Sequence, residues 1–221
     1  MRGVLKRACD VLLALAGCAF CLPLGVLAAA AVVADTGFPV FYRQERVGKN
    51  GRLFMSLKFR SMRVDAEKGT GPIQASAEDG RVTRVGRFLR GLAIDELPQL
   101  VNILVGDMSV VGPRALRPVE VEAVDGFPRH MRDYPEFDER CAVRPGLTGV
   151  AQLLLARDAP RSVKFAWDVW YVRHGSLGLD VSLFAASLLV TVRARWETTA
   201  GRPVLSVLRT RVARSKDGPG D

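Results

Sequence analysis

A long apolar segment near the N-terminus dominates the hydropathy pattern of the chain. Residues 11–34 contain no charged side chain, and as a helix they would extend roughly 36 Å, enough to cross the core of a bilayer. The segment fits a cleaved signal peptide, because Arg2, Lys6 and Arg7 precede it, or a straight transmembrane anchor. It also fits a re-entrant helix that bends at Pro23. The pattern alone slightly favours the straight anchor, since proline is tolerated in spanning helices.

Residues 38–60 show the pattern of a β-hairpin. Asn50-Gly51 is a turn signal, and it separates a β-rich stretch from one that alternates between apolar and polar residues. The alternation predicts one face with Leu53, Met55, Leu57 and Phe59 and an opposite face with Ser56, Lys58 and Arg60. Two cations on one face, close to a turn, could meet an anion, although a solvated basic face would look the same.

Residues 94–104 show the pattern of an amphipathic helix. Asp95 is placed to cap the helix, and Glu96 lies in its first turn. Apolar residues follow at the spacing i, i+3, i+4, i+7 and predict the buried face: Leu97, Leu100, Val101 and Leu104. Adjacent acids at a helix start have a purely structural explanation in capping and in the helix dipole.

The remaining pattern predicts mostly helices. Residues 118–140, residues 162–175 and the apolar stretch Leu177–Trp196 are predicted helical, and the last of these suits an interfacial or packing helix. Trp167, Trp170 and Tyr171 would share one helical face, which indicates core packing, with an interfacial belt as the alternative. Arginines recur at every third position before residue 91: Arg81, Arg84, Arg87 and Arg90. Residues 64–80 are predicted to form a loop.

Composition and charge limit the class of protein. Hydrophobic residues make up 48% and charged residues 25% of the 221 residues, which excludes a disordered chain and a polytopic membrane protein. Lys and Arg number 32 against 23 for Asp and Glu, a formal net charge of +9. This balance suits a phosphate-rich partner: a nucleic acid, an anionic membrane surface or a phosphorylated substrate.

Candidate chemistry gathers after residue 94. Asp95 and Glu96 are followed by two turn-forming stretches, each of which places an arginine beside proline and glycine: Arg114 and Arg144. Carboxylates ringed by arginines on rigid turns resemble a site for a phosphorylated substrate. A different interpretation of the charge is a non-enzymatic protein that binds a membrane surface or nucleic acid.

From residue 6 to residue 195 the chain resembles the bacterial sugar transferase family, the monotopic polyprenyl-phosphate glycosyl-1-phosphate transferases. The motifs are Lys6-Arg7-x-x-Asp10, Tyr42-Arg43-Gln44-x-Arg46-x-Gly48, Lys58-Phe59-Arg60-Ser61-Met62, Gly86-Arg87-Phe88-Leu89-Arg90, Asp95-Glu96-Leu97-Pro98-Gln99-Leu100-x-Asn102, Gly106-Asp107-Met108-Ser109, Gly112-Pro113-Arg114, Arg144-Pro145-Gly146-x-Thr148-Gly149 and Asp168-x-x-Tyr171. Each motif alone is weak, but their order and density are highly specific.

The resemblance implies an enzyme that moves a sugar 1-phosphate from a UDP-sugar to polyprenyl (undecaprenyl) phosphate and releases UMP. Asp95 would be the nucleophile and a Mg²⁺ ligand, and Glu96 would assist with the proton or the metal. Arg114 and Arg144 match motif arginines suited to substrate phosphate. Weaker candidates of the same kind are Lys58, Arg60, Arg87 and Arg90.

The resemblance also implies the architecture. We expect a mostly helical α+β domain with one small β-hairpin, a re-entrant N-terminal membrane helix and interfacial amphipathic helices. Residues 1–35 would be the anchor, 36–200 the catalytic domain and 201–221 a basic, mobile tail. The enzyme would sit on the cytoplasmic face of the bacterial inner membrane among membrane lipids, without a nucleic-acid partner, and a homodimer stays open. Ala115 and residues 153–158 depart from the family pattern, which leaves the sugar undefined.

Overall fold

The computed structural model describes residues 2–66, 68, 79–124, 127–156 and 159–192. The helices are α1 Arg2–Thr36, α2 Arg84–Gly91, α3 Gln99–Val105, α4 Phe137–Arg140, α5 Val150–Leu154, α6 Arg161–His174 and α7 Leu177–Val192. The strands are β1 Phe41–Val47, β2 Leu53–Phe59, β3 Ser109–Val111, β4 Val121–Val124, β5 Phe127–His130 and β6 Gly146–Thr148. Short 3₁₀ turns are η1 Lys49–Gly51, η2 Ile94–Glu96 and η3 Met131–Asp133. About 55% of the described residues are helical and the sheets are small, which confirms the α+β prediction.

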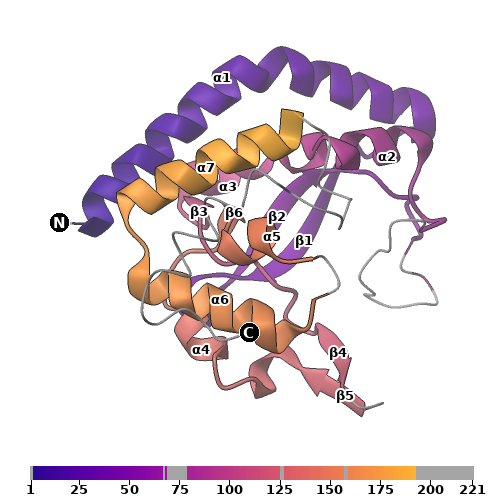
Figure 1. Cartoon of the computed structure of the whole chain (residues 1–221). Coiled ribbons are helices and arrows are strands. Elements are labelled where there is room, and N and C mark those ends of the chain that lie inside the picture. The colour runs from indigo at the N-terminus through magenta and orange to yellow at the C-terminus, as the bar shows by residue number, and fades with distance from the viewer. Residues whose placement is uncertain (1, 67, 69–78, 125–126, 157–158, 193–221) are drawn as a thin grey trace.

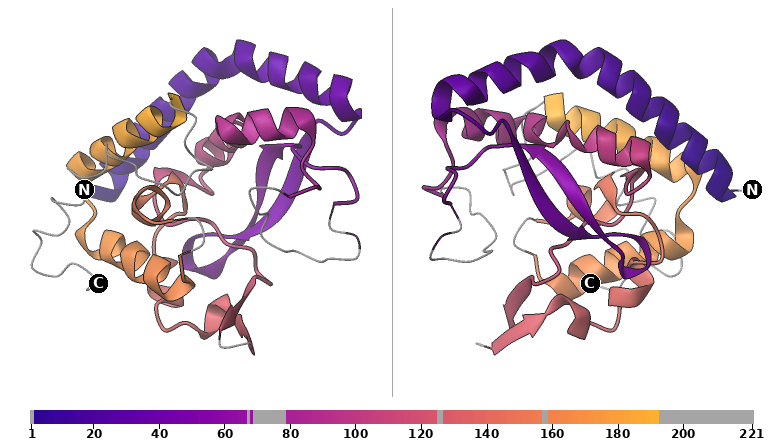
Figure 2. Two further views of the ribbon diagram at one scale, coloured as in Figure 1. Left: turned by 45° about the vertical axis from the view of Figure 1, so that its right-hand side comes forward. Right: turned by 180° about the vertical axis from the view of Figure 1, so that it is seen from behind.

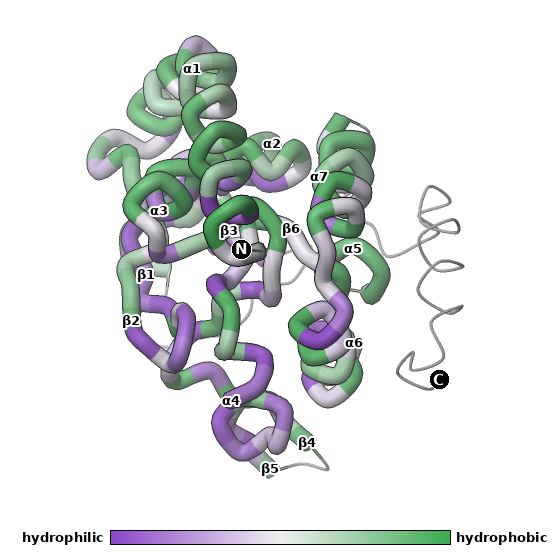
Figure 3. Tube along the Cα trace, turned by 90° about the vertical axis from the view of Figure 1, so that its left-hand side faces the viewer, coloured by the Kyte–Doolittle hydropathy of each residue, from purple (hydrophilic) through white to green (hydrophobic). Residues whose placement is uncertain are grey.

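Helix α1 is continuous through Pro23 and arches over the rest of the described protein (Figure 1). It is the one described helix that is long and apolar enough to cross a membrane, judged by length and composition. Most residues of α1 are hydrophobic (Figure 3), and several large ones are exposed: near the middle of the helix Phe20 is 88% exposed. An exposed apolar surface of this kind is typical of a contact with a membrane or with another protein.

Polar contacts fix the first turns of α1 to the body. Each of three side chains of α1 bonds to a different part of the core: Lys6 to Asp180 (2.7 Å), Arg7 to the carbonyl oxygens of Ile103 (2.6 Å) and Leu104 (2.9 Å), and Asp10 to Ser109 Oγ (2.8 Å) and the Val110 amide (3.0 Å). These bonds use the charged positions that flank the apolar segment. They fix the N-terminal end of α1 against α3, β3 and α7.

The other end of α1 is held by apolar packing. Ala28 and Val32 are buried in a cluster with Phe59 of β2, Leu89 of α2 and Ile94 of η2. Both ends of α1 therefore contact the same folded body, over which the helix passes (Figure 2). Large apolar side chains between the two ends are exposed, among them Leu12, Phe20 and Leu27.

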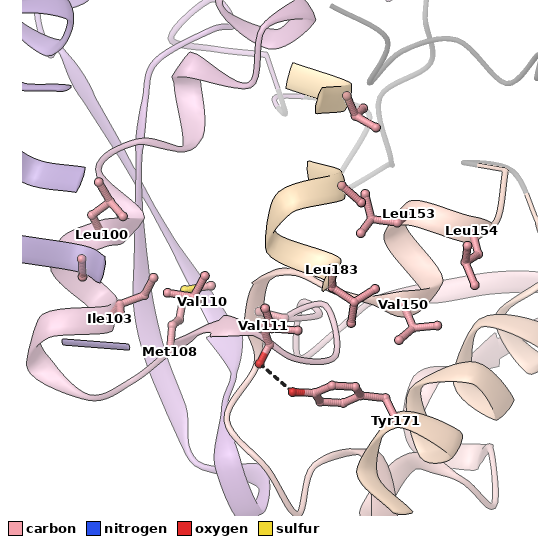
Figure 4. Close-up of a cluster of buried hydrophobic side chains, with 14 of the residues drawn as sticks. Leu100, Ile103, Met108, Val110, Val111, Val150, Leu153, Leu154, Tyr171 and Leu183 are labelled. Atoms are coloured by element: carbon pink, nitrogen blue, oxygen red, sulfur yellow. Dashed lines mark hydrogen bonds between the residues drawn. The ribbon is translucent and has the colours of Figure 1, made fainter. Parts of the chain in front are cut away.

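The main core lies below α1 between α3, β3 and the C-terminal helices (Figure 4). Ile103 and Leu153 are fully buried there, and Leu183 of α7 is 1% exposed. The Tyr171 hydroxyl crosses this core and donates to the carbonyl oxygen of Val111 at 3.2 Å. Trp170 and Tyr171 are both buried, so the aromatic face of α6, predicted from residues 162–175, serves core packing.

Strands β3 and β6 run parallel and interlock the two turn-forming stretches. A side-chain carbon added at Gly146 would lie 2.1 Å from the Gly112 amide nitrogen, so only glycine permits this approach. The turns that carry Arg114 and Arg144 are therefore built as one unit.

The β1–β2 hairpin confirms the prediction for residues 38–60, but part of its predicted polar face is buried and part of its predicted apolar face is exposed. Ser56 of β2 is buried, whereas Leu53 and Met55 are 49% and 51% exposed. The polar face of β2 points into the protein because it contributes to the site described below, so Lys58 does not belong to a solvated basic face.

The helix predicted for residues 118–140 is wrong. Residues 118–140 form the β4–β5 hairpin, η3 and the short α4 rather than one helix, so the described protein contains two antiparallel hairpins. Residues Val121–Val124 alternate between exposed and half-buried, a period of two that their mixed charge obscures in the sequence. Three predictions fall wholly or partly outside the described residues. They are the end of the helix predicted for residues 177–196, the tail 201–221 and most of the loop 64–80.

The single helix predicted for residues 94–104 is also wrong. The chain forms η2 and then starts α3 at Gln99, with Pro98 at the N-cap, so Asp95 does not cap a helix. Val101 is 47% exposed, and the buried positions of α3 include Leu100 and Ile103. The structural explanation for two adjacent acids therefore does not apply.

Candidate active site

The Asp95-Glu96 pair lies on η2, between the end of α2 and the start of α3. Ala93 precedes it with φ 55° and ψ 22°, a left-handed conformation that non-glycine residues rarely adopt. This residue turns the chain sharply and directs the pair into the protein. Asp95 is only 8% exposed.

Cations surround Glu96. Lys58 of β2 forms an ion pair with its carboxylate, and the Arg114 guanidinium lies 3.4 Å from the same oxygen. Arg114 remains about half exposed, so its guanidinium can contact an incoming group. The pocket around these groups is lined by Arg46, Ser56, Lys58, Glu96, Gln99, Met108, Arg114, Ala115, Gly146 and Leu147.

The two carboxyl groups differ in acidity because their surroundings differ. Burial raises the pKa of Asp95 to about 6, although Lys58 opposes this shift. Burial also acts to raise the pKa of Glu96, but Lys58 and Arg114 outweigh it and lower the value to about 2. Glu96 is therefore ionised throughout the physiological range, while Asp95 gains or loses a proton near pH 6. Such divergence between neighbouring acids is typical of active sites.

A buried framework holds Arg114 in place. Arg140 donates to the Arg114 carbonyl oxygen at 2.7 Å, and Arg46 donates to that of Ala115 at 2.9 Å. Arg140 is fixed in turn by two bonds to Asp168 (3.0 and 2.8 Å), and both side chains are almost completely buried. The backbone on both sides of the Arg114–Ala115 bond is thus clamped.

Arg46 was not among the predicted site residues, although it lines the pocket and its charge acts on Glu96. Burial lowers the pKa of Arg46 to about 10, which still leaves the side chain charged. The sequence carried a signal for it, because Arg46 belongs to the Tyr42–Gly48 motif, but neither hairpin alternation nor local charge distinguished it from Arg43.

The other predicted cations are distributed more widely. The charge of Arg90 acts on Asp95, whereas Arg87 is exposed on α2. Arg60 is 5% exposed and donates to Thr36 Oγ1 (2.6 Å) and the Gly37 carbonyl oxygen (2.5 Å). Arg144 does not line the pocket around Glu96; its Nε donates to the Gly106 carbonyl oxygen at 2.7 Å. The structure thus gathers Lys58, Arg90 and Arg114 near the acidic pair and places Arg60 and Arg144 against other parts of the backbone.

The carboxylate oxygens of the acidic pair are suitable ligands for a magnesium ion whose other ligands would be substrate oxygens and water. Among the described residues no hydrogen bond or ion pair holds the Asp95 carboxylate, so its oxygens are available as hard ligands. No group of three or more acidic, histidine or cysteine ligands occurs in the described part of the chain. Mg²⁺ commonly binds through one or two carboxylates together with substrate phosphates and water.

The comparisons with known proteins agree with this chemistry. The family model described as bacterial sugar transferase matches residues 1–194. The exopolysaccharide production protein PSS of Rhizobium leguminosarum bv. phaseoli is 37% identical over 191 residues, which cover 84% of this chain and 94% of the relative. A UDP-glucose:undecaprenyl-phosphate glucose-1-phosphate transferase of Caulobacter vibrioides is 41% identical over 197 residues, 86% of this chain and 71% of the relative.

A third relative is a putative undecaprenyl-phosphate N-acetylgalactosaminyl 1-phosphate transferase of Bacillus subtilis. It is 45% identical over 136 residues, 62% of this chain and 72% of the relative. The chain belongs to the bacterial sugar transferase family. It is an enzyme, a phosphoglycosyl transferase, and the alternative of a non-enzymatic basic binding protein is wrong.

Proposed function

We propose that this enzyme transfers a sugar 1-phosphate from a UDP-sugar to undecaprenyl phosphate and so starts the assembly of a surface glycan. The Caulobacter vibrioides relative is named for UDP-glucose and undecaprenyl phosphate, and the Bacillus subtilis relative for undecaprenyl phosphate. The observation that carries the proposal is the buried Asp95-Glu96 pair, in which one carboxyl group titrates near neutrality and the other is fixed by two cations. A negatively charged nucleophile and a dianionic donor require such fixed positive charge.

In this mechanism Asp95 attacks the phosphorus that carries the sugar. A bond forms between a carboxylate oxygen and this phosphorus, the bond to the bridging oxygen breaks, and UMP leaves with the electron pair. The resulting aspartyl phosphosugar is then attacked by a phosphate oxygen of the acceptor, which releases the Asp95 carboxylate. Asp95 is suited to both steps because it is mostly ionised at neutral pH yet poorly solvated.

The neighbouring residues stabilise charge and hold position. Arg114 is half exposed beside Glu96, and its guanidinium would bind oxygens of the donor diphosphate. Glu96 fixes Lys58 and Arg114 through its own charge, so that both cations are placed before the substrate arrives. Arg46 adds positive charge from the wall of the pocket.

We further propose Mg²⁺ as the cofactor, held by Asp95 with oxygens of the donor. The ion would neutralise diphosphate charge and make UMP a better leaving group. Glu96 is already committed to its two cations, so Asp95 is the protein ligand that this pair offers.

The proposed location is the cytoplasmic face of the inner membrane, with α1 re-entrant. Both ends of α1 contact the same body, and its middle carries the exposed apolar side chains. A helix fixed in this way enters and leaves the bilayer on one side, and Pro23 lies inside it where a bend is tolerated. Asp95 would then lie at the surface where a soluble nucleotide sugar meets a lipid acceptor.

The test is UMP release by the purified full chain. The protein in detergent is given Mg²⁺, undecaprenyl phosphate and a panel of UDP-sugars one at a time. We expect UMP from at least one sugar, and no UMP from the Asp95→Asn variant. Absence of UMP with every sugar, or undiminished turnover by the variant, would contradict the proposal.

A further inference from the structure

A second groove lies along the first turns of α1, separate from the pocket of the acidic pair. It has a volume of about 630 Å³ and is lined by Gly3, Val4, Arg7, Ala8, Val11, Leu12 and Arg144. None of these residues lines the pocket around Glu96. The six residues of α1 recur as adjacent pairs at every fourth position, so they form one continuous stripe of the helix.

Two arginines line this groove: Arg7 from the middle of the stripe and Arg144 from outside α1. Arg7 bonds to the carbonyl oxygens of Ile103 and Leu104, and Arg144 Nε donates to that of Gly106, so both guanidinium groups are fixed at the end of α3. The two terminal amino groups of Arg144 make no hydrogen bond to a described residue. They are held in position and remain available to a ligand.

The residues that line the groove suit an amphiphilic ligand, with one anionic end and one apolar end. Among the described residues no acidic side chain lines the groove, and the members other than the two arginines are glycine or aliphatic. An anionic group of the size of phosphate would bind the free edge of Arg144, and hydrocarbon would cover the aliphatic stripe of α1. A soluble phosphate compound would leave this stripe exposed to water, whereas a lipid would cover it.

We propose that this groove binds an anionic membrane phospholipid, with its phosphate on Arg144 and Arg7 and its acyl chains along α1. The proposal rests on the membrane location of α1 proposed above. The acceptor lipid is not the occupant, because its phosphate must reach Asp95 in the proposed mechanism, and neither Asp95 nor Glu96 lines this groove. The bound phospholipid would hold the N-terminal end of α1 at the headgroup level while catalysis occurs elsewhere.

Native mass spectrometry of the full chain tests the proposal. The protein in detergent is mixed with equal amounts of phosphatidylglycerol, phosphatidylcholine and undecaprenyl phosphate, and bound lipids are counted by mass. We expect the wild type to prefer phosphatidylglycerol to phosphatidylcholine. Arg144→Gln should weaken phosphatidylglycerol binding about tenfold, the usual effect of removing one charged hydrogen-bonding group.

A second variant covers the case in which Arg144→Gln fails to fold. Ala8→Glu places a carboxylate on the exposed stripe of α1 and should repel the anionic headgroup to a similar extent. The matched control is Arg132→Gln, which removes the same charge at an exposed position away from α1 and should leave binding unchanged. Asp95→Asn should also bind phosphatidylglycerol normally.

Three outcomes would overturn the proposal. Both groove variants could bind phosphatidylglycerol like the wild type, or Arg132→Gln could weaken binding as much as they do, which would indicate a general charge effect. The groove variants could instead lose undecaprenyl phosphate alone, which would assign the groove to the acceptor. Because no donor sugar is present, failure of this experiment is distinct from failure to release UMP.

Discussion

At the scale of single residues, Asp95 and Glu96 are neighbours in the chain with opposite electrostatic environments. Glu96 has two cations within 4 Å, whereas Asp95 is buried and no ion pair with a described residue holds it. The carboxylate of Asp95 is consequently a high-energy group in the folded protein at neutral pH. In the proposed mechanism the ionised form is the reactive one, so this cost in stability serves the activity.

Replacing Asp95 with Asn should therefore stabilise the protein while abolishing transfer. The folded-state pKa of about 6 lies above the usual value of 3.8, so the wild type gains relative stability as the pH falls through 6 and loses it as the pH rises. At pH 7.5 we expect the variant to have a larger free energy of unfolding, by about 1–3 kcal/mol. Chemical denaturation in detergent at pH 7.5 and pH 4.5 measures the difference, which should shrink at the lower pH.

The control is Asp138→Asn, which removes an exposed carboxylate on α4 and should change stability little at either pH. A lower free energy of unfolding for Asp95→Asn at pH 7.5 would show that the ionised carboxylate is a stabilising group.

Lys58 should set the acid limb of the pH profile. Its charge lowers the pKa of Asp95, so Lys58→Gln should move the pH below which kcat/KM declines to a higher value than in the wild type. The pH at which this decline occurs can be measured even if the substitution also lowers kcat/KM at every pH. Lys49→Gln, at an exposed lysine of η1, should leave the limb near pH 6. An unshifted limb in the Lys58 variant would contradict the electrostatic coupling.

Sequence reasoning located much of this site but not its geometry. The acidic pair, Lys58 and Arg114 could be proposed from motif resemblance and from the company of glycine and proline turns. Arg46 lies in one of the motifs too, but nothing in the sequence set it apart from Arg43, because its role depends on a contact with Ala115, 69 positions further along the chain. Arg144 was expected among the phosphate ligands, and only the fold shows that it faces a different groove.

At the scale of elements, the connection between α2 and α3 decides where the acidic pair points. A regular helix over residues 94–104 would leave Asp95 as a cap in contact with solvent. The left-handed residue Ala93 and Pro98 prevent this by breaking the chain into η2 and α3. Periodicity could not reveal it, because Leu97 and Leu100 suit both arrangements.

Because Ala93 has a positive φ, we expect the glycine variant at this position to be more stable than the wild type and the valine variant to be less stable. Ala93→Gly should stabilise the protein by up to about 1 kcal/mol, because glycine adopts positive φ without steric cost. Ala93→Val should destabilise it by about 1–2 kcal/mol, since a β-branched side chain opposes this backbone. Chemical denaturation measures both variants. Ala142→Gly, at an exposed position without positive φ, should show the ordinary small loss, and a loss of the same size for Ala93→Gly would contradict the argument.

The buried Arg140–Asp168 pair should affect both stability and rate. Asp168→Asn should lower the free energy of unfolding by about 3–5 kcal/mol, because it leaves a buried guanidinium without its counter-charge. The double variant Arg140→Met with Asp168→Leu should recover part of this stability. Its kcat should stay low, since the bond from Arg140 to the Arg114 carbonyl oxygen is absent. Full recovery of kcat by the double variant would show that Arg140 does not position Arg114.

At the scale of the whole molecule, α1 is an integral part of the fold rather than a detachable anchor. The sequence showed its length and its charged flanks, but it left three topologies open. The missing information was that Lys6, Arg7 and Asp10 bond to segments about 90 to 175 positions away in the chain. These long-range contacts are what support the re-entrant topology.

Labelling with a membrane-impermeant maleimide tests that topology. In a background without the four native cysteines, Gly3→Cys and Phe38→Cys should both resist labelling from outside spheroplasts and react after permeabilisation. The two positions flank α1, and Phe38 is 77% exposed. A spanning helix would expose one of the two positions to the external reagent, and this result would contradict the re-entrant arrangement.

The central claim is that Asp95 carries the sugar phosphate during catalysis, and intact-protein mass spectrometry tests it most directly. The full chain is incubated with Mg²⁺ and a reactive UDP-sugar in the absence of acceptor, then digested and mapped. We predict an added mass of one sugar phosphate on the peptide that contains Asp95, formed with one equivalent of UMP and lost when undecaprenyl phosphate is added. Transfer without any adduct, or an adduct on another residue, would contradict the account.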